Sequence, residues 1–281
     1  MLPLILGVLG VAATGVYTVG SHAAIKDIKD EIEGINDSAE RLTYETKQLI
    51  KDTNDKLDKV YEIAVNQKKY IYQTTLKKAV DVTKKMKIKH DDIELKNEIV
   101  AISNNIDSVE RAILPQVANV AAIGLASAIS SSVGLAGGIL GTTIVGVAVT
   151  FKLDEAKEQY AKIKAECEMA KTECTKKNNV TRQIADTVNV ITGLNELTKK
   201  SVDNVEEILS KKGNNEENWT AREKESVWIM SNLVKALSDI INSNIVTEKG
   251  NMSTEYENKI KKQKEVMISK GYSIPTKITI E

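Results

Sequence analysis

Hydrophobic and polar positions follow a helical period over the first third of the chain. Apolar or small side chains recur at intervals of three and four residues, separated by Lys, Asp and Glu. The members of this first seam are Ile25, Ile28, Ile32, Ile35, Ala39, Leu42, Thr46 and Leu49. A mean spacing of 3.5 residues places all of them on one side of a helix. After a four-residue step from Thr53 to Leu57 the pattern resumes, and it predicts a helix running to near Met86.

A second seam begins after Lys152. Its members are Leu153, Ala156, Tyr160, Ile163, Cys167, Ala170 and Cys174. These side chains are smaller than those of the first seam, so large Ile and Leu on one helix can pack against Ala and Cys on the other. The second helix is predicted to continue to Leu209. Two interpretations remain open, an ordinary antiparallel bundle within one chain or a coiled coil between chains.

Between Arg111 and Lys152 the chain carries no ionisable side chain. A stretch of this length suits two membrane crossings, with a bend at Ser130–Gly134 and arms at 113–129 and 133–151. Small residues at four-residue spacing allow close approach of the two arms. They are Ala122 and Ala126 in the first arm, and Gly134, Gly137, Gly138 and Gly141 in the second.

The chain is also apolar from Leu2 to about Gly20, which is long enough for one further crossing. An uncleaved anchor helix is favoured over a signal peptide, because no Lys or Arg precedes the apolar stretch. The residues predicted to enter the bilayer are Leu4, Ile5, Val8, Leu9, Ile123, Leu125, Ile129, Leu135, Ile139, Leu140, Ile144, Val145, Val147 and Phe151. The alternative is that the apolar helices are buried within a soluble bundle.

The C-terminal part carries local signals for helix ends and core. Residues 210–218 read as a loop, and Thr220-Ala-Arg-Glu223 fits a capping box that starts a helix. Trp219 and Trp228 are predicted core anchors. A short charged helix is expected after Gly250, followed by an extended tail.

These patterns predict an all-α protein: an elongated antiparallel coiled coil or helical bundle with an apolar hairpin and an N-terminal hydrophobic helix. Its predicted segments are an anchor helix (1–22), coiled-coil helices (23–112), the hairpin (113–151), a second long helix (152–212) and a C-terminal helical segment with a tail (213–281). Helix–helix contacts outside the hairpin are predicted at Ile28, Ile32, Ile35, Leu42, Ile163 and Cys167.

Composition narrows the function classes. The 281 residues hold 39 basic and 39 acidic side chains and only 4% aromatics. Basic and aromatic residues do not cluster together, which disfavours nucleic-acid binding. Two turns of helix separate Cys167 from Cys174, too far for an intrachain disulfide, so both are predicted to be reduced seam residues. The alternative is an interchain disulfide.

Sites for chemistry are not apparent in the sequence. It holds no phosphate-binding loop, no nucleophile elbow and no paired Cys-x-x-Cys. Asp91 and Asp92 read as helix-capping acids, and a lone His22 and a lone His90 form no metal cluster. We therefore expect no enzymatic activity, no cofactor, no metal and no small-molecule substrate.

The order of long helix, apolar hairpin and long helix resembles the α-helical pore-forming toxins related to cytolysin A and haemolysin BL. The resemblance implies a soluble bundle that switches to a membrane oligomer. Charged coils after a membrane segment also resemble bacterial receptor-like coiled-coil proteins.

The leading hypothesis is a non-enzymatic scaffold of the bacterial inner membrane, with the hairpin in the lipid bilayer. Charges that follow the apolar segments directly, at Lys26, Lys29, Lys152 and Lys157, predict cytoplasmic arms. Self-association through the coiled coil is expected. The alternatives are a pore-forming protein, a secreted protein and a soluble helical-bundle interaction protein.

Overall fold

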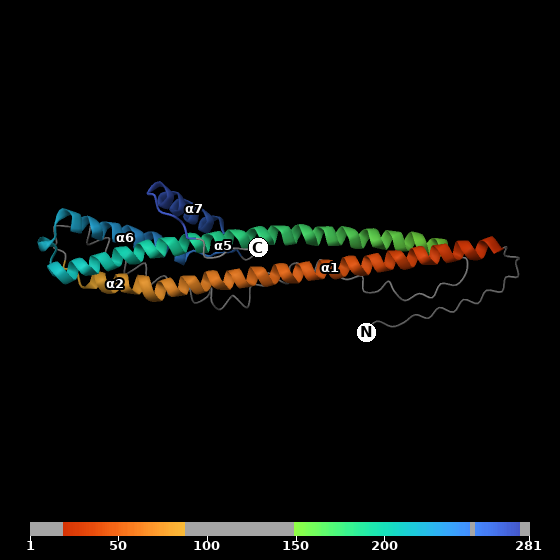
Figure 1. Cartoon of the computed structure of the whole chain (residues 1–281), viewed down its shortest axis with the longest axis horizontal. Helices are drawn as coiled ribbons and strands as arrows, with labels where there is room; N and C mark the ends of the chain where they lie inside the picture. Colours follow the sequence, from red (N-terminus) through yellow and green to blue (C-terminus); the bar gives the residue numbers. More distant parts are fainter. Residues whose placement is uncertain (1–18, 88–148, 248–250, 276–281) are drawn as a thin grey trace. The chain divides into compact units, whose positions relative to one another are not determined.

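The computed structural model describes residues 19–87, 149–247 and 251–275 (Figure 1). Over these residues the chain is helical and has no strand, which confirms the predicted all-α class. The elements are α1 (Val19–Ile71), a π-helical turn η1 (Tyr72–Leu76), α2 (Lys77–Lys84), α5 (Val149–Lys212), a 3-10 turn η3 (Glu216–Asn218), α6 (Ala221–Asn242) and α7 (Thr254–Ser269).

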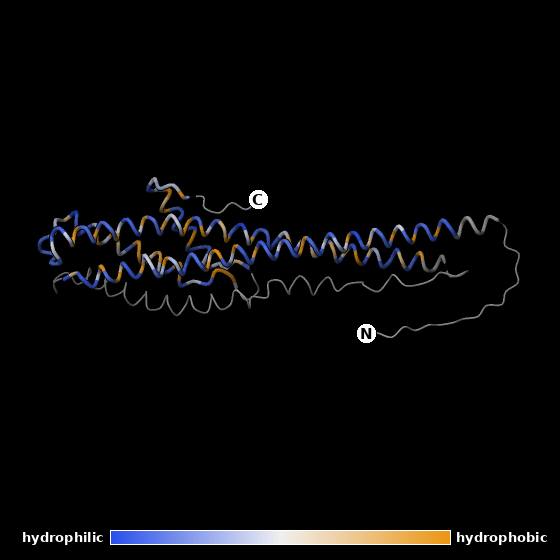
Figure 2. The backbone as a smooth tube through the Cα atoms, turned by 60° about the horizontal axis from the view of Figure 1, so that its bottom comes forward, coloured by the Kyte–Doolittle hydropathy of each residue, from blue (hydrophilic) through white to orange (hydrophobic). Residues whose placement is uncertain are grey.

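The chain forms two compact units. Of the described residues, the first unit holds 19–46 and 149–169, and the second holds 47–87, 170–247 and 251–275. In the first unit the described segments are the N-terminal parts of α1 and α5, which lie side by side (Figures 1 and 2). An ion pair of 2.7 Å between Glu31 and Lys157 joins them.

In the second unit, α1 and α5 run in the same direction. Gln67 of α1 donates a hydrogen bond of 3.2 Å to Thr192 of α5, and the two residues are 125 positions apart. Lys78 of α2 bonds Asp203 of α5 at 2.7 Å, again across 125 positions. Because both pairs are separated by the same number of residues, the α1–α2 segment and α5 run parallel to each other. The predicted antiparallel pairing of the two long helices is therefore wrong, because a heptad seam specifies which face is buried but not which way the partner helix points.

Helix α6 returns antiparallel to α5. At the far end of α5, the Lys87 amide donates to the Asn214 carbonyl at 2.8 Å. At the other end of α6, Lys68 reaches the Ser243 carbonyl. Helix α7 then advances in the direction of α5, since Gln183 bonds Glu257 and Gly193 lies beneath Met267, both pairs 74 positions apart.

Helix α5 is central to the core of the second unit. Nine consecutive residues, from Thr187 to Asn195, are buried. A helix that is buried all round needs neighbours on every side. In the hydropathy view, orange positions alternate with blue ones along the described helices (Figure 2). The core includes Leu57, Leu76, Ile184, Leu194 and Val234.

The buried face of α1 in the second unit differs by one position from the predicted seam. Leu49, a predicted seam member, is 37% exposed, whereas the next residue, Ile50, is only 7% exposed. Ile50 packs against Ala170 and Cys174 of α5, so a large side chain does meet two small ones. With Ile50 as the member, the buried positions continue through Thr53 with the regular four-three spacing, and the four-residue step lies before Ile50.

A π-helical turn interrupts the helix between α1 and α2. The Lys77 amide donates to the Tyr72 carbonyl, five residues back, which inserts one extra residue into the turn. Both Tyr72 and Leu76 are buried on either side of this insertion. The extra residue changes the register of the buried face, and the heptad pattern alone does not predict it.

The start of α6 has the capping box that the sequence predicts. The Thr220 hydroxyl accepts from the Glu223 amide, and the Glu223 carboxylate accepts from the Thr220 amide. Trp219 is buried and its indole donates to the Gly213 carbonyl at 3.0 Å. Trp228 is half-buried against the core.

Candidate functional site

Of the residues predicted to enter a bilayer, only the backbone of Phe151 falls within the described residues. Leu4, Ile5, Val8, Leu9 and the hairpin residues from Ile123 to Val147 lie outside the described residues, as do Ala122, Ala126, Gly134, Gly137, Gly138 and Gly141. Phe151 belongs to the first turn of α5, and its side chain is also outside the description.

Among the helices of residues 19–87, 149–247 and 251–275, none is both long enough and apolar enough to cross a membrane. This finding overturns the prediction of a hairpin-inserted protein of the bacterial inner membrane. The physical reason is visible in α1 and α5, where Lys, Asp and Glu recur along the helix, each of which opposes insertion. The pore-forming interpretation gains no support from these helices either.

In the first unit, the residues predicted to make helix–helix contacts are buried to different extents. On α5, Ile163 and Cys167 are buried. On α1, the four predicted contact residues are only half-buried; they are Ile28, Ile32, Ile35 and Leu42, called here the open seam. Among the described α1 residues of this unit, Thr46 is the one that is buried. Helix α5 therefore covers only part of the apolar stripe that α1 presents.

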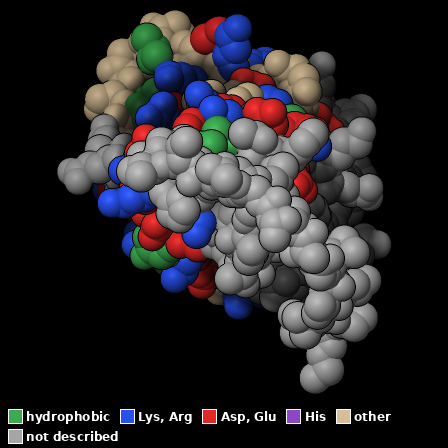
Figure 3. Space-filling view, turned by 90° about the vertical axis from the view of Figure 1, so that its right-hand side faces the viewer, with side chains coloured by type: hydrophobic (Ala, Val, Ile, Leu, Met, Phe, Trp, Pro, Cys, Tyr) green, Lys and Arg blue, Asp and Glu red, His purple; other side chains and the backbone are tan. Residues whose placement is uncertain are grey.

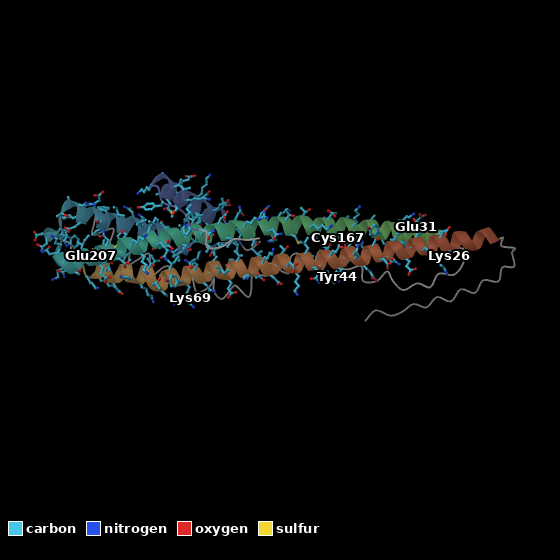
Figure 4. The ribbon with its side chains drawn as sticks, viewed as in Figure 1. Lys26, Glu31, Tyr44, Lys69, Cys167 and Glu207 are labelled. Atoms are coloured by element: carbon cyan, nitrogen blue, oxygen red, sulfur yellow. The ribbon has the colours of Figure 1, made fainter. Side chains whose placement is uncertain are left out.

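Charged side chains surround the open seam. From Lys26 to Glu45, α1 carries seven acidic and three basic residues. Glu31, labelled in Figure 4, is paired with Lys157 of α5. Arg41 is paired with Glu45 on the same helix at 3.9 Å. On the face seen in Figure 3, basic and acidic side chains intermix among the described atoms, with fewer hydrophobic ones between them. The open seam is thus an apolar stripe with a polar, predominantly acidic rim.

This arrangement is suited to binding another helix. Half-buried side chains at heptad spacing gain further burial when a third or fourth helix packs over them. Each square ångström of apolar surface so removed from water contributes about 25 cal/mol. The exposed Tyr44, 64% accessible on the same helix, is not part of the heptad stripe.

A second site, in the second unit, centres on a buried lysine. Lys68 is only 1% exposed. Its ammonium group donates to the Ser243 carbonyl at 2.6 Å and approaches the Ile241 carbonyl at 3.4 Å, at the C-terminal end of α6. It also lies 4.6 Å from the centroid of the Tyr256 ring of α7. One α1 side chain therefore connects the end of α6 and the start of α7.

The electrostatics of this site are unusual. Burial, and secondarily the neighbouring Lys259, lowers the pKa of Lys68 to about 7. Burial also raises the pKa of Tyr256, so its phenol stays neutral. Lys259 bonds the Ser243 hydroxyl at 2.7 Å and the Glu255 carboxylate at 2.6 Å. Burial thus brings the pKa of Lys68 close to neutral pH.

The sequence reasoning missed Lys68, although a signal for it exists. Ala64, Lys68 and Ile71 continue the four-three spacing of the buried face. A lysine at such a position stands where an apolar residue is expected. Its exposed neighbour Lys69, labelled in Figure 4, has the ordinary placement for this residue type.

The remaining candidate side chains are structural. Cys167 and Cys174 are free and buried. Burial raises the pKa of the Cys174 thiol, against a smaller opposing effect of a hydrogen bond with Thr53. Such a thiol has little reactive thiolate at neutral pH. Within the described part of the chain, no group of His, Cys, Asp and Glu is arranged to hold a metal ion.

No family model, curated protein or solved structure matches this chain. Functional inference therefore depends on the geometry of the two sites.

Proposed function

We propose that the protein is a non-catalytic helical interaction protein that self-associates, with the open seam of α1 as the contact surface. The observation that supports this proposal is the incomplete burial of Ile28, Ile32, Ile35 and Leu42 on α1, whereas Ile163 and Cys167 of α5 are buried. A seam with regular spacing and partial cover is the pattern of a helix pair that joins a larger bundle.

We assign a second copy of the chain as the occupant of this surface. It carries the same open seam with the same heptad spacing. A two-fold contact therefore covers both seams at once with one self-complementary interface. In the assembled state the helices form an intermolecular coiled coil.

The acidic rim adds a diagnostic property. Two copies bring like charges together, so salt strengthens their association by screening the repulsion. A partner with a basic rim behaves in the opposite way, because salt weakens attraction between unlike charges. The sign of the salt dependence thus separates self-association from binding of a basic helix.

The test is sedimentation equilibrium of the full chain across a concentration series, with Ile32→Glu as the test variant. Glutamate at this position removes apolar burial and adds a fourth acidic group beside Asp30, Glu31 and Glu33. We expect the dissociation constant to rise about tenfold or more, which corresponds to a loss of about 1.4 kcal/mol.

The matched control is Tyr44→Glu, which also exchanges a hydrophobic residue of α1 for glutamate but at an exposed position outside the stripe. It should leave the dissociation constant unchanged. The wild-type chain should associate more tightly at 0.5 M salt than at 0.05 M, the order-of-magnitude range over which screening becomes short-ranged (about 14 Å to 4 Å). A chain that stays monomeric at every concentration and salt level contradicts the proposal.

A further inference from the structure

We propose that residues 95–113, which lie outside the described residues, dock as an antiparallel helix on an exposed apolar face of α1 in the second unit. The proposal concerns the second unit only and is independent of the function proposed for the open seam.

Helix α1 leaves an apolar row open in the second unit. Leu49, Ile63 and Tyr70 are 37%, 36% and 53% exposed, and multiples of seven residues separate them along the helix. Side chains at this spacing share one side of a helix. They are called here the outer stripe. Exposed polar residues, Glu62 and Asn66 among them, flank the stripe, as is typical of a helix face that packs against another helix.

The direction of the helices indicates where a partner for this stripe comes from. The α1–α2 segment and α5 run parallel. At the end of α2, the Lys87 amide donates to the Asn214 carbonyl, just beyond the end of α5. Residues 88–148 connect this point to Val149 at the beginning of α5. Because α5 passes through the second unit before it reaches Asn214, the connection has to return past this unit in the direction opposite to α1.

The connecting chain carries a heptad seam of its own. Its members are Leu95, Ile99, Ile102, Ile106, Val109 and Ile113. Their alternating spacing of four and three residues predicts a helix with one apolar side. Pro115 follows two residues after the last member and predicts the end of this helix. An amphipathic helix of this length depends on packing of its apolar side for its stability.

Charge favours an antiparallel placement of residues 95–113 beside α1. Residues 68–87 hold seven lysines and one aspartate, whereas residues 91–98 hold four acidic side chains and one lysine. Antiparallel docking places this acidic beginning beside the lysine-rich end of the α1–α2 segment. Lys69, labelled in Figure 4, and Lys84 are exposed there and free of burial by the described helices. Opposite charges on the flanks of two packed helices favour the pairing and set its orientation.

The turn between the two segments sets the register. Ile106 is as far along the chain from residue 88 as Tyr70 is, and the same holds for Ile113 and Ile63. An antiparallel pair that turns near residue 88 thus brings Ile106 level with Tyr70, and Ile113 level with Ile63. Large apolar side chains then cover the two members of the outer stripe nearest to the turn.

The tethered segment has an advantage over a second copy of the chain as the occupant of the outer stripe. It is joined covalently to α2, so its local concentration at the stripe does not depend on the protein concentration. A second copy covers the stripe only as the protein is concentrated. The concentration dependence of the contact therefore separates the two occupants.

The experiment is hydrogen exchange of the full chain, at a protein concentration at which sedimentation shows a monomer. The variants Ile63→Glu and Tyr70→Glu each place a charge in the outer stripe. We expect the protection of the amides of residues 95–113 to fall about tenfold or more in each variant. The amides of residues 184–194 of α5 should keep their protection, because both substituted side chains are exposed in the described structure.

Asn66→Glu is the matched control, because it adds the same charge to an exposed position of α1 between the two stripe residues. It should leave the protection of residues 95–113 unchanged. Three results overturn the proposal: no protection of residues 95–113 in the unmodified monomer, equal protection in all three variants, or protection that arises only at high protein concentration. The last result assigns the outer stripe to a second copy.

Discussion

Single side chains determine how closely the helices of the second unit approach. Gly193 is the clearest case, because a Cβ atom there would lie 2.8 Å from Met267 Cε and 2.9 Å from Pro275 Cδ. Its role is steric: no side chain separates α5 from the α7 segment above it. Lys68 is the electrostatic counterpart, a charge-bearing residue at a core position.

A pair of glycine substitutions tests this steric role. Gly34 also lies within a helix, but a Cβ atom there would meet nothing within 4 Å. Gly34→Ala should stabilise the chain by about 1 kcal/mol through helix propensity alone. Gly193→Ala gains the same propensity but must displace Met267 and the Pro275 ring, and should destabilise by about 1 kcal/mol net. Urea denaturation measures both, and equal stabilisation by the two variants contradicts close packing at Gly193.

At the scale of the element, the burial of α1 depends on a register that the heptad pattern does not fully specify. Leu49 and Ile50 are adjacent and both apolar, so either can continue the stripe. The structure selects Ile50, which contacts Ala170 and Cys174, and leaves Leu49 accessible.

The two residues provide a matched test of that register. Ile50→Ala removes buried methylene groups and leaves a cavity, so it should cost about 2–4 kcal/mol of stability. Leu49→Ala should cost only about 0.5 kcal/mol of stability, because the Leu49 side chain is partly exposed and its removal leaves no buried cavity. The denaturant midpoints of the two variants show which of the two residues is buried. A larger loss for Leu49→Ala means that the heptad seam as predicted from sequence is the buried one.

At the scale of the element, some features could be predicted from the sequence and others could not. The two long helices and the Thr220 capping box follow from local spacing and side-chain chemistry, and the structure confirms the capping box. The direction of α5 relative to α1 and the π-turn at Tyr72–Leu76 depend on tertiary packing, which spacing does not encode. Lys68 was missed because a lysine is normally assigned to a solvated face.

The membrane prediction was wrong because it depended on the order of apolar and charged segments along the chain. It was built on the charge-free stretches near residues 1–22 and 113–151, whereas the described helices carry charge along their length. No described helix is suited to cross a membrane. Hydropathy order alone therefore led to the wrong functional class.

At the scale of the whole molecule, the account predicts two separate behaviours. The first unit offers the open seam, half-covered by α5, to a second copy. The second unit offers the outer stripe of α1 to residues 95–113 of the same chain. Because the two sites belong to different units, a variant at one site should leave the behaviour of the other unchanged.

The central claim is that copies of the chain meet through the open seam. The most direct measurement is hydrogen exchange of the unmodified full chain at two protein concentrations, one below and one well above the dissociation constant found by sedimentation. The account predicts that amides of residues 26–45 gain protection at the higher concentration while those of α6 do not. Equal exchange of residues 26–45 at both concentrations, in a chain that does associate, would show that the contact lies elsewhere and contradict the claim.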